Sequence, residues 1–166
     1  MNRLILSGLL VFSFFGLRAQ NYQLHSVFIY SFARYIQWPE EASTGDFRIL
    51  VLGESSILPE LNNLAGKKKV GERTIRVTKI NSVAELGKCN ILFLPNDKSI
   101  LLHEILAKLG DAATLVVTEQ AGLATEGSNI NFIQRDGKLV FELNSSSFIQ
   151  RKLKPSTELT RLAILI

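Results

Sequence analysis

The stretch Phe47-Arg48-Ile49-Leu50-Val51-Leu52-Gly53 decides the fold class of this chain. It is a short, nearly continuous apolar run that ends at a glycine. Such a run is typical of a strand that is buried on both faces, as the strands of helix-covered parallel sheets are. Two further runs of this kind cover residues 90–94, which Pro95 closes, and residues 114–118. Together the three runs predict a mostly parallel sheet.

The segments between these runs predict helices and one more strand. Ser55 or Ser56 can cap a helix that stops at Gly66, and a later helix stops at Gly110. Strands separated by helices pair in parallel through right-handed crossovers, so we expect a three-layer α/β sandwich. The predicted elements are helices over residues 57–65, 82–86 and 98–109 and an alternating strand over residues 73–80.

The two ends of the chain complete this arrangement. Residues 22–37 have apolar side chains at helical spacing, and Trp38-Pro39 ends that helix because the residue before a proline avoids the helical region. Two alternating runs around Asp136-Gly137 predict an antiparallel hairpin towards one edge of the sheet. The C-terminal segment is predicted to be helical in two pieces, which Pro155 separates and the second of which Ser156 caps. These segments cover residues 130–134, 138–143 and 145–163.

The first 19 residues read as a secretion signal. Arg3 supplies the positive start, residues 4–17 are apolar, and Ala19 is a small residue at a plausible cleavage site. The apolar run is shorter than the roughly 20 residues that span a bilayer, which argues against a membrane anchor. We therefore expect cleavage near Ala19, a single domain over residues 20–166 and a location in the periplasm.

Charge and cysteine content limit the partners and the redox chemistry. Loss of Arg3 and Arg18 with the signal lowers the formal net charge from +4 to +2, which argues against nucleic acid as a partner. Cys89 is the one cysteine of the sequence, so the chain cannot close an internal disulfide. Cys89 is either a small apolar residue at a strand start or an exposed thiol that pairs between chains.

No catalytic constellation or metal motif is recognisable in the sequence. His25 and His103 lack the neighbours of a triad or a zinc site. Ser55 follows the first buried strand, but Gly-x-Ser-x-Gly is absent, so an exported hydrolase is a weak alternative. The loop from Gly66 to Gly71 holds three lysines without the P-loop pattern, and is either a solvated turn or a contact for an acidic partner. We predict no enzyme activity and no cofactor.

Several polar residues follow the predicted parallel strands. Glu54, Pro95 and Glu119 fall at such positions, where doubly wound folds bind ligands, so they predict a possible ligand edge. They could equally be ordinary polar loop residues. Glu142 lies mid-strand and either faces solvent or pairs with Arg34 or Arg161, which would tie the hairpin to a helix.

Two long blocks of the sequence resemble the YfiR/HmsC family of exported regulators. The first block is residues 28–39, from Phe28 to Trp38-Pro39. The second covers residues 130–144 and continues through Leu153-Lys154 to residues 159–163. It contains Glu142, Asn144 and Arg161, to which we assign structural roles. The order and character of the three buried runs agree with the family as well.

The resemblance implies a periplasmic, non-enzymatic protein with a Rossmann-like α/β fold that tends to dimerise. Relatives of this kind repress a membrane-bound diguanylate cyclase by binding its periplasmic domain, and outer-membrane partners or a redox change relieve the repression. Cys89 stands alone here, so control by an internal disulfide is not carried over. A sensor kinase would fit the same architecture.

These inferences lead to one main functional prediction and one alternative. The main prediction is a regulator that lowers cyclic di-GMP by contacting an inner-membrane signalling protein, with an outer-membrane lipoprotein as a further partner. The alternative is a periplasmic small-molecule-binding module, with its ligand at the Glu54, Pro95 and Glu119 edge, that acts with a sensor kinase or an outer-membrane receptor. The candidate partner contacts are Arg34, Tyr35, Trp38, Lys67, Lys68 and Lys69.

Overall fold

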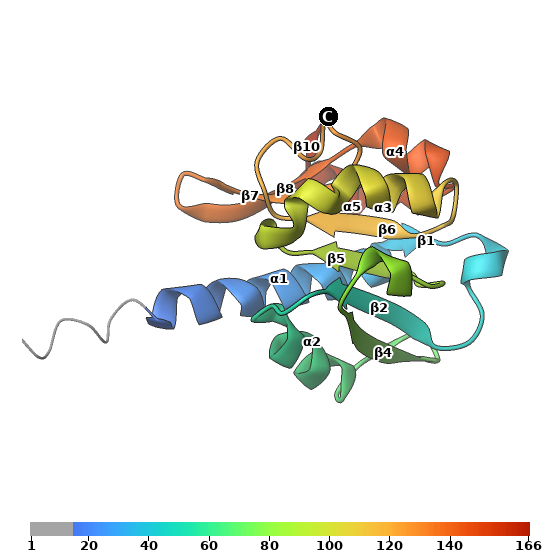
Figure 1. Ribbon diagram of the computed structural model, residues 1–166, viewed down its shortest axis with the longest axis horizontal. Helices are drawn as coiled ribbons and strands as arrows, with labels where there is room; N and C mark the ends of the chain where they lie inside the picture. Colours follow the sequence, from blue (N-terminus) through green and yellow to red (C-terminus); the bar gives the residue numbers. More distant parts are fainter. Residues whose placement is uncertain (1–14) are drawn as a thin grey trace, which may run out of the picture.

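The computed structural model describes residues 15–166, with side chains from residue 22 onward, as a mixed α/β domain (Figure 1). Most of the expected secretion signal lies outside the described residues, and its cleavage stays a prediction. None of the helices described combines the length and the apolar character needed to cross a bilayer.

A mostly parallel sheet forms the centre of the domain. Within the described residues the eight strands of this sheet run in the order β10-β8-β7-β6-β5-β2-β4-β3. All pairs from β4 to β7 are parallel, whereas β7 pairs with β8 and β3 with β4 in the antiparallel sense. The strands are β2 (Phe47–Leu52), β3 (Lys69–Val70), β4 (Arg73–Ile80), β5 (Ile91–Leu94), β6 (Leu115–Thr118), β7 (Ile130–Arg135), β8 (Lys138–Leu143) and β10 (Ile164–Leu165).

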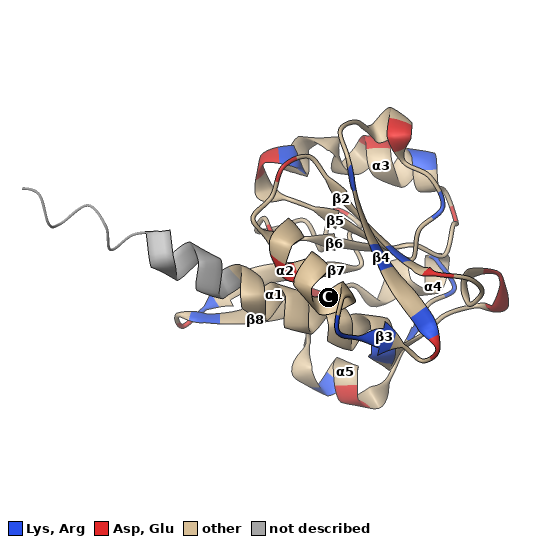
Figure 2. Ribbon diagram, turned by 90° about the horizontal axis from the view of Figure 1, so that it is seen from below, with Lys and Arg blue, Asp and Glu red and all other residues tan. Residues whose placement is uncertain are grey.

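Helices cover both faces of this sheet. The strands alternate their side chains between two apolar clusters, as the period of two requires. One cluster packs Phe32 of α1, Leu61 of α2 and Leu159 of α5 against the sheet, and the other packs Ile105 of α3 against the opposite face. Figure 2 shows α3 on one side of the strands and α1, α2 and α5 on the other. The helices are α1 (Phe15–Tyr35), α2 (Ile57–Ala65), α3 (Leu102–Leu109), α4 (Ser145–Gln150) and α5 (Thr157–Leu162), with 3-10 turns η1 (Glu40–Ala42), η2 (Val83–Glu85) and η3 (Asn96–Leu101).

The predicted α/β architecture with a mostly parallel sheet is confirmed, whereas its likeness to a Rossmann-like fold stays a prediction. The bounds of α2 and β4 agree with the sequence analysis residue for residue. The turn at Asp136-Gly137 joins β7 and β8, and both of these residues adopt a positive φ, as a tight hairpin turn requires. Ser156 caps α5 by accepting a hydrogen bond from the amide of Leu159 (3.2 Å).

Two local predictions were wrong, and one short strand was not predicted. The first helix ends at Tyr35, because Ile36 and Gln37 form strand β1 and pair with β9 (Lys154–Pro155). The chain end adds the short strand β10, which pairs with β8 and was not expected from the sequence. The helix predicted over residues 82–86 is the 3-10 turn η2 (Val83–Glu85), and the first residues of the helix predicted over 98–109 belong to the 3-10 turn η3 (Asn96–Leu101).

Cys89 lies inside the second apolar cluster, with 5% of its surface exposed. Burial raises the pKa of its thiol to about 12, and a side-chain hydrogen bond with Thr114 opposes that shift. The structure therefore supports a small apolar role for Cys89, and the exposed-thiol alternative is wrong.

Candidate functional site

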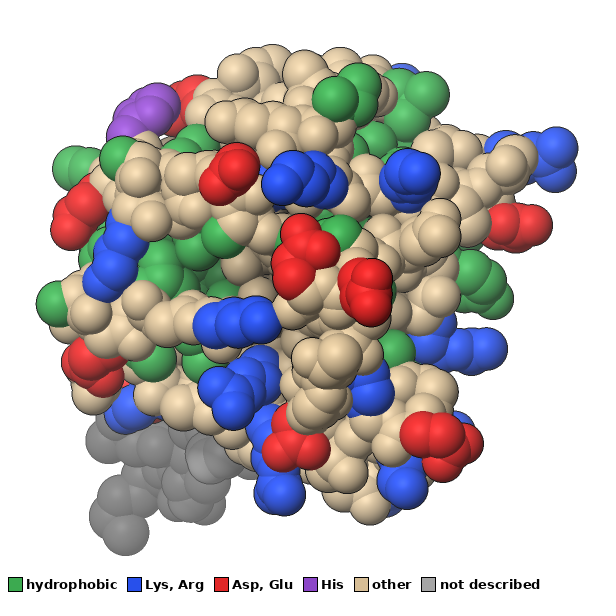
Figure 3. Space-filling view, turned by 90° about the vertical axis from the view of Figure 1, so that its right-hand side faces the viewer, with side chains coloured by type: hydrophobic (Ala, Val, Ile, Leu, Met, Phe, Trp, Pro, Cys, Tyr) green, Lys and Arg blue, Asp and Glu red, His purple; other side chains and the backbone are tan. Residues whose placement is uncertain are grey.

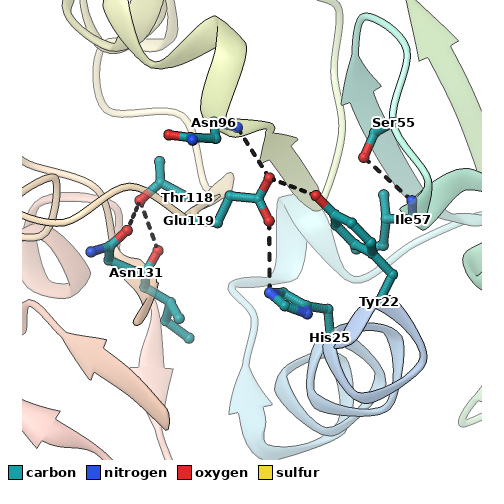
Figure 4. Close-up of polar contacts among 9 residues, drawn as sticks. Tyr22, His25, Ser55, Ile57, Asn96, Thr118, Glu119 and Asn131 are labelled. Atoms are coloured by element: carbon teal, nitrogen blue, oxygen red, sulfur yellow. Dashed lines mark hydrogen bonds and ion pairs between the residues drawn. The ribbon is translucent and has the colours of Figure 1, made fainter. Parts of the chain in front are cut away.

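The carboxyl ends of β5 and β6 lie side by side and bring polar groups from distant parts of the chain together (Figure 4). Strand β6 ends at Thr118, so Glu119 is the first residue beyond the sheet. Strand β5 is followed by Pro95 and then by Asn96, the start of η3. This is the edge at which open parallel sheets place their ligand sites.

Glu119 is at the centre of this site. Its Oε1 atom accepts one hydrogen bond from the Tyr22 hydroxyl (3.1 Å) and one from the backbone amide of Asn96 (3.0 Å). Its Oε2 atom lies 3.6 Å from Nε2 of His25. Only 10% of the Glu119 side chain is exposed. The carboxylate is thus held in one orientation between α1 and the loop after β5.

Helix α1 supplies the aromatic side of the site. Tyr22 and His25 are three residues apart and so lie on one face of the helix. Their rings are 5.1 Å apart, and the His25 ring meets the ring of Phe132 on β7 edge-on at 4.4 Å. His25 is 4% exposed. The aromatic contacts therefore fix the start of the described part of α1 against the sheet.

A second polar network lies directly behind Glu119. The hydroxyl of Thr118 lies 2.7 Å from Oδ1 of Asn131 and 2.9 Å from the hydroxyl of Ser128, all in fully buried positions. The side-chain amide of Asn131 donates to the Glu142 carboxylate (2.9 Å). Buried polar groups that satisfy one another make a rigid unit. This network anchors β6 to β7 and β8 and so fixes the position of Glu119.

A cavity of about 430 Å³ opens beside the Glu119 carboxylate. Its volume falls in the range of small-ligand sites, roughly 300–1,000 Å³. Both polar and apolar side chains line it. The lining residues are Tyr22, His25, Asn96, Glu119, Phe132, Ile133, Gln134 and Leu139.

The structure places the residues of the predicted ligand edge in different environments. Pro95 is buried and directs the chain to Asn96, whose amide reaches Glu119. Glu54 is exposed, forms an ion pair with Lys79 and does not line the cavity. Ser55 accepts a hydrogen bond from the amide of Ile57 (3.3 Å), the first residue of α2, whereas Ser56 holds the N-cap position.

Sequence reasoning missed Tyr22 and His25 as parts of this edge. The one signal in the sequence is their spacing of three residues, which places both on one face of a helix. That spacing does not predict which residue they contact. Glu119 is 97 residues away from Tyr22 in the sequence. Only the docking of α1 across the sheet brings these residues to Glu119.

The predicted partner contacts form one surface, apart from Trp38. Arg34 and Tyr35 are exposed on α1, and the Arg34 guanidinium lies 5.7 Å from the ring centroid of Tyr30. The Tyr30 hydroxyl donates to the backbone carbonyl of Lys69 (3.1 Å), which brings the exposed loop 67–69 next to α1. Trp38 instead packs edge-on against Phe47 at 5.4 Å, and its indole N–H donates to Ala33.

The residues expected to be structural have different environments. Asn144 caps α4 by accepting from the amide of Ser147 (3.0 Å), and its side-chain amide donates to the carbonyl of Ala124. Glu142 bonds to Asn131, and among the described residues it forms no ion pair with Arg34 or Arg161, so that expected pairing was wrong. Arg161 is exposed on α5.

The amino edge of the sheet is built differently (Figure 3). Lys and Arg side chains alternate with Asp and Glu across this face. A cavity of about 410 Å³ lies here, lined by Lys88, Lys108 and Lys152 among others. The ammonium groups of Lys88 and Lys108 donate to backbone carbonyls of the surrounding loops. These cations therefore serve to hold the loops at this edge.

Comparison with known proteins identifies one family. A family model described as YfiR/HmsC-like matches residues 22–164, which covers nearly the whole described chain. A search of curated proteins found no match. The matched segment includes α1 from Tyr22 onward, strands β2 to β8 and the Glu119 site.

Proposed function

Because this chain belongs to the YfiR/HmsC-like family, which is regulatory rather than catalytic, we propose that it represses a membrane-bound signalling enzyme by direct contact in the periplasm. The enzyme is a diguanylate cyclase or a related sensor, and the contact is with its periplasmic domain. Repression lowers cyclic di-GMP and biofilm formation. The family match over residues 22–164 is the observation that carries this proposal.

The surface that we propose for the contact is the basic and aromatic surface of Arg34, Tyr35 and the loop 67–69. Tyr30 brings α1 and the loop 67–69 together, because it contacts both Arg34 and the backbone of Lys69. In the sequence these two segments are separated by about one helix and one strand. Arginine and tyrosine are common anchors of protein interfaces. The lysines add a positive field that favours an acidic partner surface and speeds encounter.

Exposed apolar side chains on the same helix support this assignment. Leu24, Val27 and Tyr35 are 48%, 52% and 42% exposed, and their spacing places them along one side of α1. Leu162 on α5 adds another exposed apolar side chain, next to a small groove between α1 and α5. A partner that covered this side would remove apolar surface from water, which is a general source of binding energy.

The proposal extends to assembly and export. The mature chain begins near Gln20 after cleavage of the signal, acts as a homodimer, and is released from its target by an outer-membrane lipoprotein. The family match and the apolar residues exposed on α1 support these steps.

A deletion and complementation experiment tests the repressor role. Deleting the gene should raise cyclic di-GMP in the native host, and the wild-type gene should restore it. A double charge reversal, Arg34→Glu with Lys68→Glu, should fail to restore it because the positive surface is lost. Lys138→Glu on the exposed hairpin is the matched control and should restore it. Unchanged cyclic di-GMP on deletion would reject the role.

A second candidate function is a small-molecule-binding module. The cavity beside Glu119, with polar groups from α1, η3 and β6 converging on it, favours this function. Such a module would pass ligand occupancy to a sensor kinase or an outer-membrane receptor. Thermal unfolding of the mature chain in the presence of metabolites tests it, since a ligand that binds only the folded state raises the melting temperature. The absence of a shift across a broad panel would argue against this function.

A further inference from the structure

We infer that the cavity beside Glu119 binds a small organic cation, an ammonium or guanidinium group attached to an apolar body, with Glu119 Oε2 as the acceptor. The inference rests on the second candidate function and is independent of the repressor role. It names the chemical class of the ligand and the atom that recognises it.

The two oxygens of the Glu119 carboxylate are used unequally. Oε1 accepts two hydrogen bonds, from Tyr22 and from the amide of Asn96. Oε2 lies 3.6 Å from His25 Nε2, which is longer than a hydrogen bond. An ionised carboxylate has about four acceptor positions over its two oxygens. Oε2 therefore keeps acceptor capacity, and the carboxylate to which it belongs lines the cavity.

The charge of the cavity wall selects for a cation. Among the described residues that line the cavity, Glu119 is the one carboxylate, and none is Lys or Arg. Lys98, two residues after Asn96 in η3, pairs with Asp97 at 3.2 Å and does not line the cavity. A carboxylate that is 90% buried attracts a cation more strongly than an exposed one does, because less water screens it. A bond from a charged donor to it is also stronger than one from a neutral donor.

The other walls suit an apolar body attached to that cation. The Tyr22, His25 and Phe132 rings stand together, and aromatic faces attract ammonium and guanidinium groups. Leu139 and Ile133 supply apolar surface on the hairpin side. A volume of about 430 Å³ accommodates a molecule with a single ring or a short chain.

Other ligand classes fit this wall less well. An anion would meet the Glu119 carboxylate, and the described residues that line the cavity include no Lys or Arg to compensate for it. A metal ion needs several ligands, and the described residues contain no group of three His, Cys, Asp or Glu side chains placed to hold one. A neutral ligand would leave the charge of Glu119 unused.

Calorimetric titration of the mature chain, residues 20–166, tests the inference. The probes are phenethylamine, its neutral analogue phenethyl alcohol and its anionic analogue 3-phenylpropionate, all used at about pH 8. We expect the amine to bind at least about tenfold more tightly than the alcohol, and the acid not to bind.

Variants connect binding to the named atom. Glu119→Gln keeps the shape and the Oε1 acceptor but removes the charge, and should weaken amine binding about tenfold or more. Glu54→Gln, at the neighbouring strand end but outside the cavity, should bind the amine like the wild type. Leu139→Lys should abolish binding by placing an ammonium group of the chain itself in the cavity. Circular dichroism melts establish that each variant is folded.

Three results would overturn the inference. The first is equal binding of amine and alcohol, which would leave a small-molecule cavity without cation selectivity. The second is undiminished amine binding by folded Glu119→Gln or Leu139→Lys. The third is no amine binding by the wild type at millimolar concentration. None of these results bears on the cyclic di-GMP experiment.

Discussion

At the amino edge of the sheet, Arg73 and Arg151 donate to backbone carbonyls of the loops, whereas at the carboxyl edge Glu119 keeps an oxygen that lines a cavity. Arg73 donates to the carbonyls of Ala42, Thr44, Gly45 and Asp46 at 2.8–3.3 Å. Arg151 donates to Gly110 and Ala112 at 3.2 and 3.3 Å.

The two edges thus contrast arginines whose guanidinium groups bind loop carbonyls with a glutamate whose carboxylate lines a cavity. Burial lowers the pKa of both arginines, and the neighbouring carboxylates of Asp46 and Asp111 oppose that shift. Both guanidinium groups donate to the loops that they join, and the buried Nε atom of Arg151 has no hydrogen-bond partner among the described residues. The Glu119 side chain is only 10% exposed, and its Oε1 atom accepts both of the short hydrogen bonds from Tyr22 and Asn96.

Replacing the buried arginine should have the largest effect on stability. Arg151 is 2% exposed and among the largest fully buried side chains described. Arg151→Ala leaves two loop carbonyls without their donor and opens a cavity, so the free energy of unfolding should fall by about 3 kcal/mol. Urea denaturation of the mature chain measures this loss.

The exposed residue Lys154 provides the control for Arg151. Lys154→Ala should change the free energy of unfolding by less than about 0.5 kcal/mol. A loss below about 1 kcal/mol for Arg151→Ala would show that the amino edge does not depend on this cation.

Arg73 offers a second test of the amino edge. Arg73→Ala removes donors to four carbonyls and the stacking of the guanidinium on Phe47 (5.1 Å), and should lower the free energy of unfolding by about 2 kcal/mol. Arg73→Lys should recover only part of this, because an ammonium group cannot reach carbonyls in a planar fork.

Arg76 on the same strand is the matched control for Arg73. It forms an exposed ion pair with Asp46 at 3.0 Å, and such pairs contribute about 0–1 kcal/mol. Equal losses for Arg73→Ala and Arg76→Ala in urea denaturation would remove the distinction between an arginine that bonds to loop carbonyls and one in an exposed ion pair.

The carboxyl edge should respond differently to substitution. Glu119→Gln retains an acceptor for Tyr22 and Asn96, so we expect the free energy of unfolding to change by less than about 1 kcal/mol. Binding of phenethylamine should still weaken about tenfold or more, which separates this edge from the amino edge. A destabilisation as large as that of Arg73→Ala would assign Glu119 to folding.

The smallest effect concerns Cys89 at the amino edge. Burial raises the pKa of its thiol to about 12, so the thiol is protonated well above neutral pH and the reactive thiolate is scarce in the folded state. At about pH 8 a thiol reagent such as DTNB should label the folded chain slowly and the urea-unfolded chain rapidly. Rapid labelling of the folded chain would show that this edge opens.

The apolar patterns were the reliable part of the sequence. The runs at 47–53, 90–94 and 114–118 predicted three central parallel strands, because a strand buried on both faces has no polar face to alternate. Strand β10 could not be predicted, since Ile164 and Leu165 become a strand only where β8 offers its edge. Strand β1 likewise depends on β9, more than 100 residues away.

The candidate site was predicted in part. Glu119 was correctly placed after a parallel strand, whereas Glu54 follows a neighbouring strand and pairs with Lys79 instead. The position after a strand determines only that a side chain reaches the carboxyl edge. Which neighbours it meets there depends on the helices that cross that edge.

By itself the sequence determined the periodicity of strands and helices, the hairpin at Asp136-Gly137 and the membership in a regulatory family, because each depends on residues near one another in the chain. The tertiary structure alone decided that α1 crosses the sheet so that Tyr22 and His25 meet Glu119. Local preferences fix how a segment folds, whereas the partner of a polar side chain depends on packing over the whole domain. For this reason the cavity beside Glu119 emerges only from the folded chain.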